Sequence, residues 1–145
     1  MEKGGVNMNI GNAALTLVAL IGTSAAQAED AAMIIGRSAF NAHCALCHGT
    51  GGKGDGEIAE LFRVPPADLT KLSERAGGSF PFPDVYRNIV NGMEKRGHGD
   101  SEMPIWGDYF IADALQDRGV NLADAVHITQ GRVLSLVYYL EAIQE

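Results

Sequence analysis

Two segments, one in each half of the chain, repeat apolar residues at the spacing of an amphipathic helix. Residues 32–47 predict a first helix that ends at Gly49, and its apolar face consists of Ile35, Ala39, Phe40 and Cys44. Residues 129–144 predict a last helix with the clearest apolar stripe, which consists of Val133, Leu136, Val137 and Leu140. Both helices should bury these faces in one core.

Shorter helices and loops are predicted between these two segments. Residues 83–91 predict a helix with proline in its first turn and Gly92 as its stop. Residues 57–62 predict a short helical turn that ends before Pro65, because residues before proline leave the helical region. Residues 108–128 are expected to form a long connection. No strand pattern persists, so the predicted fold is all-α, with helices and long loops.

The amino-terminal segment has the features of a secretory signal peptide. Lys3 precedes an apolar run at residues 13–21, and residues 26–28 form a small-residue cleavage site. The run is shorter than the roughly 20 residues that a membrane-spanning helix needs. We therefore expect residues 1–28 to be a cleaved leader and residues 29–145 to form the mature domain. An uncleaved anchor and a translation start at Met8 remain as alternatives.

Size and charge limit the possible function further. Removal of residues 1–28 leaves 117 residues, enough for one domain and too few for two. The net charge is −7, which makes nucleic acid an unsuitable partner. The acidic residues concentrate from Asp100 onward, where the sequence holds eight acidic residues and only two basic ones, Arg118 and Arg132. This acidic end either keeps the surface solvated or steers the protein toward a basic partner.

The only two cysteines of the chain lie in the sequence Cys44-Ala-Leu-Cys47-His48, the pattern that attaches haem covalently. Two thiols one helical turn apart can each add to a vinyl group on one edge of the porphyrin. The next residue, His48, then lies under the iron as its proximal axial ligand. One motif predicts one haem c per chain, and an exported protein suits this attachment.

The two cysteines could also form a redox pair, a structural disulfide or part of a zinc site. A thioredoxin-like redox pair would need a βαβ unit, which the sequence does not show. A structural disulfide would close so short a loop that it would stabilise little. A zinc site could use His43, Cys44, Cys47 and His48, but no second ligand pair follows at zinc-finger distance.

A glycine-rich segment follows the motif directly. Residues 49–56 hold five glycines and Lys53, a composition that could suggest a phosphate-binding loop. The segment lacks the Gly-Lys-Ser/Thr ending of such a loop. We therefore predict a turn that wraps the edge of the porphyrin.

The motif and its flanks resemble the class I c-type cytochromes, in particular the monohaem bacterial members. The residues that carry this resemblance are Gly36, Phe40, Cys44, Cys47, His48 and the pair Tyr139-Leu140. It implies a class I cytochrome c fold wrapped around one haem, in which the first and last helices cross closely at a glycine. Gly36 would then face Tyr139 or Leu136, a packing reason for a glycine inside a helix.

The resemblance also suggests the sixth ligand of the iron. An electron carrier of this class uses methionine, and the mature chain offers Met33, Met93 and Met103. Met33 precedes the first helix on the wrong side. Met103 begins a Met-Pro-x-Trp-Gly segment that is similar to the ligand loop of many bacterial cytochromes c, so it is the predicted ligand. Met93 and His98 remain the alternatives.

Two further predictions concern the surroundings of the haem. The family uses a proline carbonyl to accept the second ring proton of the proximal histidine, and Pro65 in Val64-Pro65-Pro66 is the favoured candidate. The spacing from His48 is longer than in compact members. Trp106 and Tyr109 could donate hydrogen bonds to the haem propionates or pack against the porphyrin.

With both axial positions filled by protein, the resemblance implies a one-electron carrier rather than an enzyme. The expected place is the periplasm, with no membrane span once the leader is cleaved, and the expected partners are a redox donor and acceptor, such as a periplasmic dehydrogenase or a terminal oxidase. A cytochrome subunit of a larger oxidoreductase complex is the alternative. An enzyme or sensor with an open sixth site is a third reading. Folding should depend on the haem.

Overall fold

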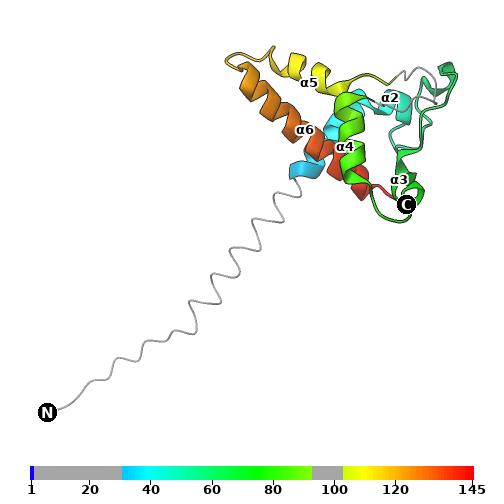
Figure 1. Cartoon of the computed structure of the whole chain (residues 1–145), viewed down its shortest axis with the longest axis horizontal. Helices are drawn as coiled ribbons and strands as arrows, with labels where there is room; N and C mark the ends of the chain where they lie inside the picture. Colours follow the sequence, from blue (N-terminus) through cyan, green and yellow to red (C-terminus); the bar gives the residue numbers. More distant parts are fainter. Residues whose placement is uncertain (2–30, 93–102) are drawn as a thin grey trace. The chain divides into compact units, whose positions relative to one another are not determined.

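The computed structural model describes residue 1, residues 31–92 and residues 103–145 (Figure 1). The compact unit is Ala32–Glu145. It begins with a helix at residues 31–43. The later elements are α2 (Ala45–His48), the 3-10 turns η1 (Ala59–Leu61) and η2 (Leu69–Lys71), α3 (Leu72–Arg75), α4 (Phe82–Asn91), α5 (Trp106–Ala114) and α6 (Leu122–Ala142). Over these ranges the structure has helices and no strand, as the sequence predicts.

The helix at residues 31–43 meets α6 at Gly36. A Cβ atom on Gly36 would lie 2.1 Å from the carbonyl oxygen of Ser135 and 2.8 Å from the Cβ atom of Tyr139. Only glycine therefore permits this approach of the two helices. One turn later, the rings of Phe40 and Tyr139 lie 5.3 Å apart. Of the two residues predicted to face Gly36, Tyr139 and Leu136, the structure confirms Tyr139.

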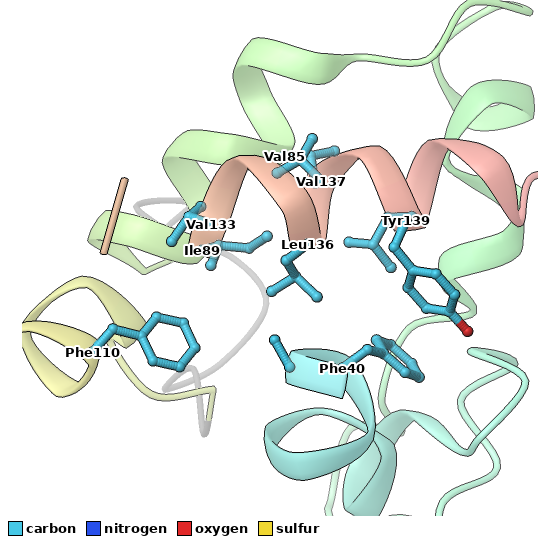
Figure 2. Close-up of a cluster of buried hydrophobic side chains, with 10 residues drawn as sticks. Phe40, Val85, Ile89, Phe110, Val133, Leu136, Val137 and Tyr139 are labelled. Carbon is cyan, nitrogen blue, oxygen red and sulfur yellow. The ribbon is translucent and has the colours of Figure 1, made fainter. Parts of the chain in front are cut away.

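The hydrophobic core lies between this helix and three later ones. Helices α4, α5 and α6 contact one another in pairs. Figure 2 shows Val85 and Ile89 of α4, Phe110 of α5 and Phe40 of the first helix around a row of α6 side chains. That row consists of Val133, Leu136, Val137, Tyr139 and Leu140. The apolar stripe predicted for the last helix is thus the centre of the core.

Three of the predicted elements are confirmed with small changes. The helix predicted at residues 83–91 is α4, which ends at Gly92 with φ +75°. The short turn predicted at residues 57–62 is η1. The first helix is interrupted by a turn at Cys44, so α2 is a separate helix that ends at Gly49.

The prediction of a long connection at residues 108–128 is wrong. Helix α5 occupies its first part, and α6 begins at Leu122, seven residues before the predicted start. Asn121 caps α6, since its side-chain oxygen accepts hydrogen bonds from the amides of Ala123 and Asp124 at 2.9 and 3.1 Å. The prediction followed the large apolar residues, whereas the first turns of α6 bury only the small Ala125 and Thr129.

The helices within residues 31–92 and 103–145 lack the features of a membrane span. No helix in these two ranges combines the length and the apolar character that a span requires. The predicted leader at residues 1–28 lies outside the described ranges.

Candidate haem-attachment site

The two cysteines lie on consecutive turns of the chain where the first helix passes into α2. The amide of Cys44 donates to the carbonyl of Phe40 at 2.8 Å, and the amide of His48 donates to the carbonyl of Cys44 at 2.9 Å. Helical hydrogen bonding therefore continues through the turn at Cys44, and the thiols stay about one helical turn apart. Both side chains are half-buried free thiols. Burial, with a smaller effect of Cys47, raises the pKa of the Cys44 thiol to about 12.

His48 is held by a single hydrogen bond to the backbone. Its Nδ1 atom lies 2.9 Å from the carbonyl oxygen of Ala67. Because a carbonyl only accepts, Nδ1 carries the proton, and Nε2 keeps the lone pair that a metal ion needs. Burial lowers the pKa of His48, and the Ala67 bond partly opposes this shift. Burial therefore favours the neutral form of the imidazole.

The acceptor of this bond corrects one sequence prediction. Pro65 was expected to supply the carbonyl, but the acceptor is Ala67, two residues further along the chain. The longer spacing from His48 had already set this chain apart from compact relatives. Pro65 itself is exposed.

The glycine-rich segment folds back on the motif. The amides of Gly54 and Gly56 donate to the carbonyls of His48 and Cys47 at 2.8 and 3.1 Å. At Gly54, φ is +79° and a Cβ atom would lie 2.4 Å from the carbonyl oxygen of Pro66, so glycine is required there. The predicted turn is confirmed, and its contact with the porphyrin stays a prediction. Lys53 forms an ion pair with Glu145 at 2.8 Å, which leaves it an unsuitable phosphate ligand.

Met103 and Trp106 flank the start of α5. Both side chains are half-buried and pack against the hydrophobic core. The Trp106 ring lies 5.5 Å from the His43 ring and 5.3 Å from the Tyr109 ring. Trp106 therefore packs among aromatic side chains, while its donation to haem propionates remains a prediction. The alternative ligands Met93 and His98 lie outside the described residues.

Sequence reasoning left His43 unassigned, and the structure places it in this aromatic cluster. Its ring lies within 5.2–5.5 Å of the rings of Trp106, Tyr109 and Phe110. Its position one residue before the motif gave no sign of this, because α5 was not predicted. His43 does not join the cysteines at a metal centre. Among the residues that the structure describes, no three His, Cys, Asp or Glu side chains gather as metal ligands.

The residues present fit a covalently attached haem. Two free thiols lie about one turn apart, and an imidazole with a free Nε2 atom follows at once. The backbone around them is tied down by the glycine-rich segment and by Ala67. A disulfide would join the two thiols, and a zinc site would add further donor side chains to them. Neither arrangement is seen in the described part of the chain.

Comparisons with known proteins agree with this assignment. Residues 31–114, more than half of the chain, match the family described as cytochrome C oxidase, cbb3-type, subunit III. The chain is also 27% identical over 103 residues to chloroplastic cytochrome c6 of Chlamydomonas reinhardtii, which covers 71% of this chain and 61% of that relative. The search of solved structures gave no significant match. Proteins of this class transfer electrons and are not themselves enzymes. The chain therefore belongs to the cbb3-type cytochrome c oxidase subunit III family and is a class I c-type cytochrome with covalently bound haem c.

Proposed function

We propose that this protein is a periplasmic one-electron carrier whose haem iron is ligated by His48 and Met103. The observation that carries the proposal is the hydrogen bond from His48 Nδ1 to Ala67, directly after two free cysteines. It fixes the ring tautomer and raises the basicity of the ligating nitrogen. The haem supplies reversible one-electron chemistry at its iron, while the protein orients the ligands and excludes water.

Met103 is the proposed second axial ligand. The side chain of Met103 is half-buried and packs against the hydrophobic core, to which the first helix also contributes. Its thioether is therefore not fully in solvent. A thioether is a soft ligand that favours ferrous iron and raises the reduction potential. With two protein ligands, no coordination position is left for a substrate, which supports a carrier.

The proposed location rests on the amino-terminal pattern. A basic residue, a short apolar run and a small-residue cleavage site at residues 26–28 are typical of an exported protein. Covalent haem attachment needs free thiols, and both cysteines are free. Amino-terminal sequencing of the mature protein tests the leader, and the expected first residue is Glu29.

A second candidate function is that of a cytochrome subunit in a larger oxidoreductase complex. The matching family is described by a subunit of cytochrome c oxidase, which favours this alternative. Size-exclusion chromatography of a native extract separates the two. A free carrier elutes as a small monomer, whereas a subunit elutes with its complex.

The ligands are tested by optical spectra of the purified haem protein in both oxidation states. We expect the ferric wild type to show the weak far-red charge-transfer band of methionine-ligated iron. The band should disappear in Met103→Ala and persist in the control Met33→Ala, whose methionine also packs against the core.

Each other outcome has a definite meaning. A band that survives in Met103→Ala moves the ligand to Met93. A wild type without the band points to His98 or to an open site, and binding of carbon monoxide by the reduced protein identifies the open site. Either result contradicts the proposed His48/Met103 pair.

A further inference from the structure

Gln144, near the carboxyl end of the chain, makes three side-chain hydrogen bonds to backbone groups. Its Oε1 atom accepts from the amide of Ser73 at 2.9 Å. Its Nε2 atom donates to the carbonyls of Leu69 and Leu140 at 2.8 and 2.6 Å. Two of these partners lie more than 70 residues away in the sequence. The end of α6 is thereby fastened to η2 and α3, beside which the carboxyl terminus lies in Figure 1.

Further hydrogen bonds hold the segment that Gln144 contacts. The amide of Leu69 donates to the carbonyl of Gly52 at 2.6 Å, and the amide of Glu145 donates to the carbonyl of Thr70 at 3.0 Å. Asp68 caps η2 through the amide and hydroxyl of Thr70. Leu69 therefore has its amide bound to the glycine-rich segment and its carbonyl bound to Gln144.

This segment begins with the residue that orients His48. The carbonyl of Ala67 accepts from His48 Nδ1, and Ala67 is two residues before Leu69. Ala67 is itself exposed, so its own side chain cannot fix the direction of its carbonyl. The hydrogen bonds at Leu69 and Ser73 contribute to holding this short, irregular stretch in place. Displacement of Leu69 would lengthen or misalign the bond to His48.

We propose that Gln144 is a positioning residue for the axial histidine, acting through Leu69 and the Ala67 carbonyl. The inference rests on the proposed ligation of iron by His48. A well-aligned bond from Nδ1 to a carbonyl makes the imidazole a stronger electron donor and stabilises ferric iron. Loss of the Gln144 hydrogen bonds weakens that bond and shifts the equilibrium toward ferrous iron.

The test uses the haem-loaded protein and the variant Gln144→Met, which keeps the length of the side chain and removes its hydrogen bonds. We expect the equilibrium constant for reduction to rise about threefold, a shift of about 30 mV for a one-electron couple. Gln130→Met is the control, because Gln130 is an exposed glutamine of α6.

A second measurement reports on the histidine itself. The His48 Nδ1 proton, followed by nuclear magnetic resonance, should exchange with solvent faster in Gln144→Met than in wild type and in Gln130→Met. A potential and an exchange rate equal to those of the control would overturn the proposal, even if Gln144→Met unfolds more easily, and would leave Gln144 a purely structural residue. Failure of the underlying ligation is seen separately, as an unchanged low-spin haem spectrum in His48→Ala.

Discussion

At the scale of single residues, His43 shows how surroundings select a protonation state. Its ring lies among three aromatic rings, and the nearby Arg132 forms an ion pair with Asp113 at 2.7 Å. Burial lowers the pKa of His43, Arg132 lowers it further, and Asp113 partly opposes them. The folded protein therefore favours the neutral imidazole more than the unfolded chain does.

This preference predicts a pH dependence of stability. The unfolded chain binds a proton at His43 near the ordinary pKa of 6.5, and the folded protein does so only at lower pH. The contribution of neutral His43 to the free energy of unfolding is complete above pH 6.5 and is lost as the pH falls through the pKa of the folded protein. His43→Phe keeps a ring in the cluster and cannot titrate, so its stability should fall less in acid. Denaturant midpoints of the haem-loaded proteins, measured on both sides of this pH, test the expectation.

The control for this measurement is His127→Phe, because His127 is an exposed histidine of α6. It should follow the wild-type dependence on pH. If His43→Phe and wild type lost stability equally in acid, His43 would not be the group responsible.

At the scale of helices, the chain uses glycine in two different ways. Gly36 lies where the first helix meets α6, and a Cβ atom there would overlap the carbonyl of Ser135. Gly131 lies inside α6, and a Cβ atom there would meet nothing within 4 Å. The first glycine serves a helix contact, whereas the second only weakens its helix.

The two glycines should respond in opposite directions to the same change. Gly36→Ala forces the helices apart, and we expect a loss of about 1–3 kcal/mol in the free energy of unfolding. Gly131→Ala reduces the freedom of the unfolded chain, and we expect a gain of about 0.5–1 kcal/mol. Urea unfolding of the haem-loaded proteins measures both. Equal effects of the two substitutions would refute the close contact at Gly36.

At the scale of the whole molecule, the fold depends on few large side chains. Among the residues that the structure describes, the fully buried side chains of greatest volume are Phe40, Phe110, Leu136, Val133, Val137 and Thr70. Several connecting segments, among them residues 49–58, are irregular and are ordered by contacts with the attachment motif. A group that binds only the folded state adds its binding free energy to the stability of that state.

We therefore expect the protein without haem to be largely unfolded. The double variant Cys44→Ser, Cys47→Ser removes the covalent attachment, and its far-ultraviolet circular dichroism should show much less helix than the wild type. Mass spectrometry confirms that the haem is absent. Wild-type helix content in that variant would mean that the polypeptide core suffices by itself.

The sequence alone determined those features that depend on neighbouring residues or on helical period. The attachment motif, its stop at Gly49, the helix at 83–91 and the apolar stripe of α6 all follow from short-range spacing. The contact of Gly36 with α6 was predicted from the resemblance to the class I c-type cytochromes, and the cost of a glycine inside a helix agreed with it.

Only the tertiary structure decided which distant groups meet. The start of α6 escaped prediction because its first turns bury small residues, although Asn121 before Leu122 is a capping signal that could have been used. Ala67 rather than Pro65 binds His48, and Gln144 reaches Leu69 across 75 residues of sequence. Such hydrogen bonds depend on the exact path of irregular backbone, which no local pattern of residues encodes.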